Sequence, residues 1–152
     1  MNAYIPPEYI VNEMQKLDIY KRIAAVRSIE DADAMRDELK DRFGALPPQA
    51  ENLLRIALVK AKAVSYHITE IRGKVGRIRF IMERTAPLDT TQIPVLVNEY
   101  AGDLRLQTGP DPEFIYLYEI EGLVEQDAEL LLAECERVVE SFGILYPAAV
   151  KE

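Results

Sequence analysis

The sequence predicts an α+β fold in which three helices are followed by a β-β-α-β-β-α arrangement of antiparallel hairpins. Two observations support this. Apolar residues recur at spacings of three and four up to about residue 66, and then alternate with polar residues at a spacing of two. Glycine- and proline-containing turns divide the alternating part into pairs of short strands, as hairpins require, with no βαβ alternation.

The first helix is predicted over residues 7–26. Proline is tolerated in a first turn, where its missing N–H costs little, so Pro7 is compatible with a helix start. The predicted buried face follows the three-four spacing. It consists of Ile10, Met14, Leu17, Tyr20 (or Lys21) and Ala24.

A second helix is predicted from Ser28 to about Phe43. Ser28 is a good N-cap, and Asp31 lies where the acid of a capping box would be. Gly44 suits the left-handed conformation that ends many helices, and two prolines at 47 and 48 prevent continuation. The predicted apolar stripe consists of Ile29, Ala32, Met35, Leu39 and Phe43.

The third helix is predicted over residues 48–66, with an apolar stripe of Ala50, Leu54, Ala57, Ala61 and Val64. Two strands follow, in ITEI (68–71) and GRIRFIM (76–82), around a hairpin turn at 73–76. Ile78, Phe80 and Met82 alternate with more polar neighbours, which is typical of a half-buried strand.

The remaining elements are a short helix, a second hairpin and a final helix. Asp89 or Thr90 can cap a helix that extends to Tyr100, and the turn at 109–112 separates strands at 103–108 and 114–120. The final helix is predicted over residues 125–142, ended by Gly143, with residues 145–152 as a tail. Its predicted stripe is Val124, Ala128, Leu131, Cys135, Val138 and Phe142.

Composition narrows the possible functions. The chain has 152 residues and a net charge of −8, which makes general nucleic-acid binding unfavourable because phosphate backbones are also negative. No apolar run approaches the roughly 20 residues of a membrane span, and the first residues do not resemble a signal peptide. The N-terminus instead reads as a fragment of a longer protein.

Catalytic motifs are missing from the sequence. There is no phosphate-binding loop, dinucleotide fingerprint, nucleophile elbow or zinc-protease motif. One cysteine, Cys135, and one histidine, His67, are too few for an ordinary zinc site. Cys135 lies in an apolar stripe, which favours a structural role over a Cys–His dyad. The chain is therefore not expected to be an enzyme.

Three charged surfaces remain as candidates for binding. On the second helix, Asp31, Glu38 and Asp41 share one face, and Arg42 follows Glu38 by four residues, the favourable order for a helical ion pair. This is either a solvated face or a surface that a basic partner recognises. The second candidate is the last helix, with acids at 125, 127, 129, 134, 136 and 140. The third is a nucleic-acid contact through Arg72, Arg77 and Arg79.

Several segments resemble one known family. AYIP at residues 3–6, LDIYKRIA at 17–24 and DELKDRFGALPPQAENLLRIALVKAKA at 37–63 are similar to the C-terminal (TRCF) domain of the bacterial transcription-repair coupling factor, Mfd. The resemblance is specific over residues 3–82 and rests on the order of elements beyond. It implies that residues 1–27 form a lead-in helix and residues 28–152 a single regulatory domain.

This resemblance implies a role in transcription-coupled nucleotide excision repair. The parent would be a cytoplasmic bacterial DNA translocase that uses ATP and Mg²⁺ in motor domains upstream, contacts RNA polymerase and DNA, and recruits UvrA. The C-terminal domain would be a monomer without a cofactor or metal. It would bind the UvrA-binding module of the same polypeptide and thereby mask it, which is autoinhibition.

The family pattern also assigns roles to residues near the end of the second helix. The resemblance implies that Glu38, Asp41 and Arg42 form ion pairs with the UvrA-binding module. Phe43, Gly44, Leu46 and Pro47 would shape the turn that follows.

Overall fold

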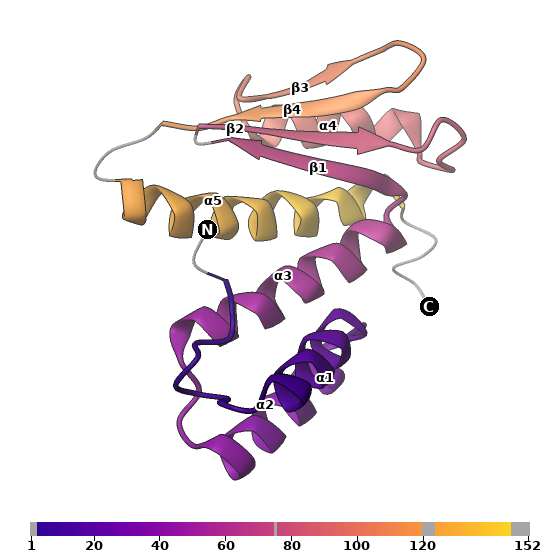
Figure 1. The fold of residues 1–152 in the computed structure, drawn as a ribbon. Helices are drawn as coiled ribbons and strands as arrows, with labels where there is room; N and C mark the ends of the chain where they lie inside the picture. Colours follow the sequence, from indigo (N-terminus) through magenta and orange to yellow (C-terminus); the bar gives the residue numbers. More distant parts are fainter. Residues whose placement is uncertain (1–2, 75, 120–123, 147–152) are drawn as a thin grey trace. The chain divides into compact units, whose positions relative to one another are not determined.

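The structure is a computed structural model that describes residues 3–74, 76–119 and 124–146 (Figure 1). It confirms the predicted α+β order. The elements are α1 (Glu13–Ala24), α2 (Ile29–Phe43), α3 (Pro48–Ser65), β1 (Ile68–Lys74), β2 (Arg77–Met82), the 3-10 helix η1 (Thr90–Gln92), α4 (Ile93–Glu99), β3 (Leu104–Gln107), β4 (Glu113–Leu117), α5 (Val124–Ser141) and the 3-10 helix η2 (Phe142–Leu145).

The chain packs as two compact units, Met1–Ala61 and Lys62–Glu152. The first contains α1, α2 and most of α3, and the second contains the sheet with α4 and α5. The division into residues 1–27 and 28–152 stays a prediction.

The first unit is built around an aliphatic core supplied by its three helices and by the segment before α1. Ile19 and Ile23 of α1 and Leu39 of α2 are almost fully buried, and so is Leu54 of α3. The segment before α1 adds Ile10 to the same cluster. Each helix therefore contributes one apolar stripe to a shared core.

The predicted first helix is wrong in its start and in its buried face. Pro6 accepts hydrogen bonds from the amides of residues 9 and 10 in a turn, and α1 begins only after Asn12, whose side chain caps Gln15. Met14 and Leu17, predicted to be inward, are 77% and 55% exposed, and Ala24 is also exposed. The later start removes Ile10 from the helix, so Ile19 and Ile23 define the buried stripe instead.

The stripes of α2 and α3 are confirmed in their centres and wrong at one residue each. Ile29 is the first residue of α2, beside the cap, and is 67% exposed. Val64 is 73% exposed, while Ala63 and Tyr66 are buried. A strict four-three spacing averages 3.5 residues per turn, so it drifts off a straight helix of 3.6 residues per turn over a long element.

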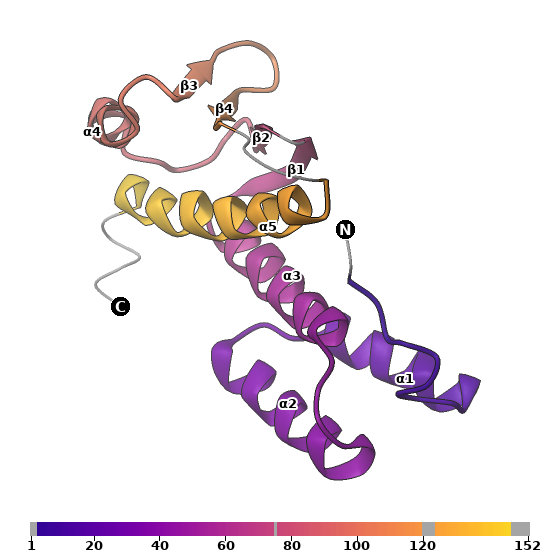
Figure 2. The ribbon, with the colours of Figure 1, turned by 90° about the vertical axis from the view of Figure 1, so that its left-hand side faces the viewer.

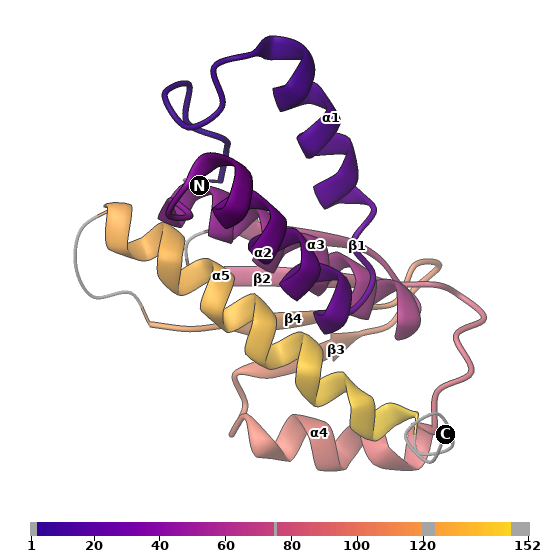
Figure 3. The same ribbon diagram turned by 90° about the horizontal axis from the view of Figure 1, so that it is seen from below.

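The second unit contains a four-stranded antiparallel sheet in the order β1-β2-β4-β3. Ile78 and Phe80 of β2 lie opposite Tyr116 and Phe114 of β4, and all four are buried. In Figures 1 and 2, α5 runs across one face of this sheet. Figure 3, seen from below, shows α5 in front of the strands with α4 alongside.

The end of the chain differs from the predicted tail. After α5 the backbone continues as η2, and Leu145 and Tyr146 are buried rather than solvated. Tyr146 Oη donates a 2.6 Å hydrogen bond to the carbonyl of Tyr66, and Leu145 accepts one of 2.7 Å from the amide of Asp89. Predictions for residues 147–152, for Val75 and Ile120, and for the side chains of 124–128 lie outside the described residues.

We predict that Gly143→Ala destabilises the second unit by about 1–3 kcal/mol through overpacking. A Cβ at Gly143 would lie 2.8 Å from Tyr66 Oη, and the Tyr66 ring is held by stacking on Tyr146. Urea unfolding followed through the amide NMR signals of the sheet measures the effect. Adding Tyr66→Phe removes the crowded oxygen, so the double variant should recover most of the loss; equal stability of the two variants would contradict this account.

Candidate interaction surface at the end of helix α2

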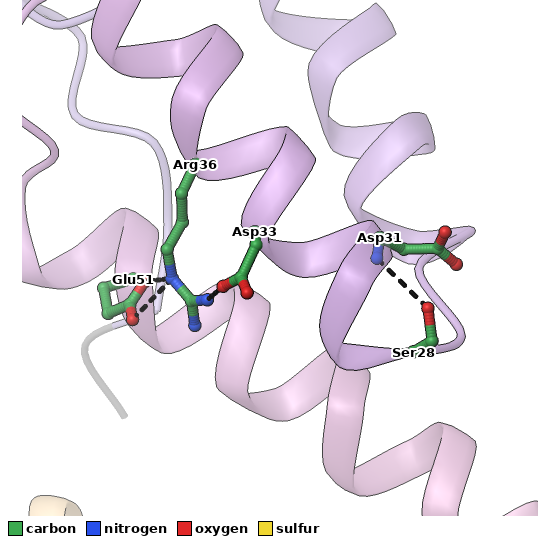
Figure 4. A network of polar contacts seen from close by, with 5 residues as sticks. All are labelled: Ser28, Asp31, Asp33, Arg36 and Glu51. Carbon is green, nitrogen blue, oxygen red and sulfur yellow. Dashed lines mark hydrogen bonds and ion pairs between the residues drawn. The ribbon is translucent and has the colours of Figure 1, made fainter.

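The start of α2 has the predicted cap. Ser28 Oγ accepts a 3.1 Å hydrogen bond from the Asp31 amide (Figure 4). Asp31 Oδ2 in turn accepts one of 3.0 Å from the amide of Arg27. The reciprocal pair resembles a capping box, except that the acid accepts from the amide before the N-cap residue and not from that of Ser28.

The end of α2 is a glycine turn leading into α3. Gly44 has φ of +92° and its amide donates to the Lys40 carbonyl at 3.1 Å. Its ψ of −166° differs from the left-handed helical value, so only the positive φ of the prediction is confirmed. Pro48 opens α3, and the Pro47 carbonyl accepts from the amides of Ala50 and Glu51.

Tyr9, from the segment before α1, closes this turn. Its hydroxyl donates to the carbonyl of Gly44 at 2.8 Å and to that of Leu39 at 3.1 Å. Its ring lies 5.8 Å from that of Phe43, and Leu46 packs against the same core. Sequence reasoning placed Phe43 and Gly44 in the turn and missed Tyr9, because the contact spans about 35 residues.

Glu38 is held by two arginines. Arg22 of α1 donates from both terminal nitrogens to the two carboxylate oxygens at 2.5 Å, and Arg42 adds a bond of 3.0 Å. The hydrogen bond from Arg22, followed by that from Arg42, lowers the pKa of Glu38 to about 2. The pair with Arg42 was predicted from helical spacing, whereas Arg22 was not.

Asp37 and Asp41 are exposed on the same end of the helix. Within the described part of the chain neither makes an ion pair. Arg42 lies with its Cζ 4.9 Å from the centre of the Phe43 ring, so a cation–π contact also holds its guanidinium. The surface thus combines a fixed cluster around Glu38 with two carboxylates that can accept a partner.

A second ion cluster joins α2 to the first turn of α3. Arg36 Nε donates to both oxygens of Glu51 at 2.8–2.9 Å, and its Nη1 donates to Asp33 at 2.7 Å (Figure 4). Arg36 and Glu51, with Lys40 and Leu46, line an open cleft of about 510 Å³. A smaller one of about 280 Å³ lies between Arg22, Met35 and Glu38.

The arginines proposed for nucleic-acid contact lie on the sheet and are partly neutralised. Arg79 makes a bidentate ion pair with Glu113, at 3.1 and 2.7 Å, and Arg72 pairs with Glu70. Arg77 is exposed. The structure therefore brings the three onto adjacent strands β1 and β2, together with acids that sequence reasoning did not assign to them.

The lone cysteine and histidine have separate surroundings. Cys135 is buried, and desolvation raises the pKa of its thiol to about 11. His67, with φ of +60°, places Nδ1 3.1 Å from Glu83 and its ring near that of Tyr146. Across residues 3–74, 76–119 and 124–146 no carboxylate, thiol and imidazole cluster suited to a metal was found, and no helix is both long and apolar enough to cross a bilayer.

Comparison with known proteins decides the family. The sequence model of the TRCF domain matches residues 1–93, a range that includes the turn in DRFGALP (residues 41–47) and all three N-terminal helices. The chain belongs to the TRCF-domain family. The resemblance predicted from residues 3–82 is thereby confirmed.

Relatives of this TRCF domain are much longer proteins. The transcription-repair-coupling factor of Bacillus subtilis (strain 168) is 33% identical over 108 residues, which is 70% of this chain and 9% of that protein. The factor of Staphylococcus haemolyticus (strain JCSC1435) is 36% identical over 86 residues, 57% of this chain and 7% of that protein. The chain therefore spans about a tenth of the length of the curated relatives it matches.

The fold has a counterpart among solved structures. A crystal structure of the C-terminal domain of transcription-repair coupling factor aligns with a TM-score of 0.70 and 22% identity, covering 93% of this chain and 89% of that one. At this identity the match establishes the fold. It extends the likeness past residue 93, where the family match ends, across the sheet and α5.

We predict that the first unit loses stability in acid because the Glu38 carboxylate becomes protonated and its ion pairs are lost. The folded-state pKa of about 2 lies below the unfolded value of about 4.3, so the ionised carboxylate stabilises the fold above roughly pH 4.3. This contribution is lost as the pH falls toward 2. Glu38→Gln should cost about 1 kcal/mol at pH 7 and progressively less below pH 4.3, in urea unfolding followed by circular dichroism.

Asp41→Asn is the matched control, since Asp41 is on the same helix and makes no ion pair within the described residues. Its stability should follow that of the wild type at every pH. A constant difference between Glu38→Gln and wild type from pH 7 to pH 2 would show that the ion pairs contribute nothing.

We also predict that Tyr9→Phe loosens the turn after α2 by about 1 kcal/mol, because the carbonyl of Gly44 loses its donor. Amide hydrogen exchange should become faster around residues 39–46. Tyr4→Phe, which alters a half-exposed ring, is the control. If both variants exchange alike, the Tyr9 hydroxyl does not hold the turn.

Proposed function

We propose that this chain is a non-catalytic regulatory domain of a transcription-repair coupling factor in bacterial nucleotide excision repair. In the parent protein, which would be a cytoplasmic DNA translocase, the domain contacts the UvrA-binding module of the same polypeptide. The contact covers the surface that UvrA uses. The domain therefore keeps the factor from recruiting UvrA until RNA polymerase and DNA have been engaged.

The observation that carries the proposal is the charged end of α2 in a TRCF domain. Asp37 and Asp41 are exposed, while Glu38 and Arg42 are held in place by each other and by Arg22. A partner therefore meets the two exposed carboxylates on a helix end that is already fixed by the Glu38 cluster, and aspartate side chains are short, so little side-chain entropy is lost on binding. Basic side chains of the UvrA-binding module are the complementary chemistry.

The ion pairs around Glu38 suggest different roles for the three charged residues of the site. Glu38 already has two arginine partners, so its main contribution is to keep α1 and α2 together beneath the surface. Arg42 positions the turn through Glu38 and Phe43. Asp41, joined by Asp37, is then the group most available to an incoming arginine.

Weak ion pairs can contribute to such a contact because its two sides belong to one polypeptide. An exposed pair contributes at most about 1 kcal/mol in isolation. Within one polypeptide, however, the partner is present at an effective concentration on the order of millimolar. At that concentration the closed form dominates once the whole contact, ion pairs and surrounding surface together, is worth more than about 4 kcal/mol. A ligand that binds the open form better by a few kcal/mol then opens it.

The test is made in a full-length factor that contains this chain. Asp37→Lys with Asp41→Lys reverses the exposed charge without touching the Glu38 cluster, and UvrA affinity is measured by surface plasmon resonance. If the surface masks the UvrA site, the variant should bind UvrA about tenfold more tightly, because the competent form is no longer a minor fraction.

Glu99→Lys with Asp103→Lys is the matched control: both residues are exposed, the charge change is the same, and they lie at the end of α4 and just after it, in the second unit. The control should bind UvrA as the wild type does. Unchanged affinity in the α2 variant, with folding verified by circular dichroism, would remove α2 from the masking contact. If UvrA affinity rises equally in the α2 variant and in the control, the effect comes from the change in net charge and not from the α2 surface.

A further inference from the structure

The open face of the sheet is basic although the chain as a whole is acidic. Strand alternation and register place one row of side chains across all four strands: Arg72 on β1 opposite Arg79 on β2, then Ile115 on β4 and Arg105 on β3. A second row places Lys74 opposite Arg77. Five basic residues and two acids, Glu70 and Glu113, therefore share this face in a protein of net charge −8.

This arrangement works against the stability of the sheet. Arg72 and Arg79 are direct cross-strand neighbours, as are Lys74 and Arg77, and like charges in these positions are unfavourable. The two acids relieve only the first pair, since Glu70 binds Arg72 and Glu113 binds Arg79. Arg77 and Arg105 remain exposed. A ligand that brings negative charge would relieve the repulsion.

Aliphatic side chains lie among these arginines. Ile81 and Ile115 are half-buried on the open face, and Leu117, opposite Arg77, is 37% exposed. The aromatic residues of these two central strands are all on the other side: Phe80, Phe114 and Tyr116 face the buried layer. The open face thus has a small apolar centre on β2 and β4 with cations around it, the pattern of a protein-binding patch.

Nucleic acid fits this face less well. Proteins that bind single strands on an open sheet stack bases on aromatic rings, and β2 and β4 offer only Ile81, Ile115 and Leu117 beside the arginines. The aliphatic side chains at the centre of this face would find no apolar surface to pack against on a phosphate backbone. The overall negative charge also opposes association with a duplex.

We propose that the open face of the β1-β2-β4-β3 sheet docks an acidic protein segment in which carboxylates are interspersed with aliphatic side chains. The carboxylates pair with Arg77 and Arg105, and the aliphatic groups cover Leu117 and Ile115. This surface is separate from the α2 residues of the proposed function, and the inference does not depend on that function.

The test uses the chain itself. A phage library of random twelve-residue peptides is selected against the immobilised protein, and the enriched peptides are synthesised and titrated by fluorescence anisotropy. The expected peptides are rich in Asp or Glu together with Leu or Ile. Arg77→Gln with Arg105→Gln should weaken their binding about tenfold, because two exposed ion pairs are lost. Neither substitution touches the pair between Arg79 and the buried Glu113.

Arg84→Gln with Lys60→Gln is the matched control, since it changes the net charge equally at exposed positions outside the four strands. It should alter binding by less than about twofold. Leu117→Ser tests the apolar centre and should weaken binding independently of salt, whereas the arginine variant should lose its effect at high salt.

Three results would overturn the proposal. The first is enrichment of peptides that lack acidic residues, or of acidic peptides whose affinity falls equally in the Arg77/Arg105 variant and in the Arg84/Lys60 control. The second is binding of a duplex DNA that is tighter than that of any enriched peptide and is lost in Arg77→Gln with Arg105→Gln. The third is concentration-dependent dimerisation in sedimentation, abolished by the same variant, which would assign the face to a second copy of the chain.

Discussion

Three phenylalanine rings determine what the second unit presents to solvent. Phe142 lies 5.4 Å from Phe80 and 5.0 Å from Phe114, centre to centre, and all three are fully buried. Because β2 and β4 are paired in register, burying Phe80 and Phe114 turns their neighbours Arg79 and Ile115 to the opposite face. The basic open face is thus a direct consequence of the same alternation that builds the core.

In the first unit the corresponding constraint is the end of α2. Tyr9 donates its hydroxyl to the carbonyl of Gly44, just past the end of α2, and to that of Leu39 in its last turns. Arg22 then binds α1 to α2 through Glu38. These two long-range contacts give the charged surface a fixed shape, so an interaction there needs no further folding of the turn.

The order of elements could be predicted because it depends on local periodicity. The alternation of Ile78, Phe80 and Met82, the cap at Ser28 and the stop at Gly44 each follow from neighbouring residues. The first helix was placed wrongly because Pro6 and Asn12 set its start through a turn and a cap that compete with the apolar spacing. Register across β2 and β4 is not visible in a single strand, so the pairing of Arg79 with Glu113 was missed. The pairing of Arg72 with Glu70 was missed although both lie on β1, where alternation places residues two apart on one face.

The candidate site was also predicted only in part, because some of its contacts are local and others join different helices. Helical spacing suffices to place Glu38, Asp41 and Arg42 near one another, since residues three and four apart share a face. It does not distinguish a carboxylate with partners from one without. Arg22 lies on a different helix, and its bond to Glu38 changes that residue from a group that can meet a partner into one that organises the surface. The functional charge is then expected at Asp41 and Asp37, so a sequence motif locates the surface while tertiary contacts decide which of its members are available.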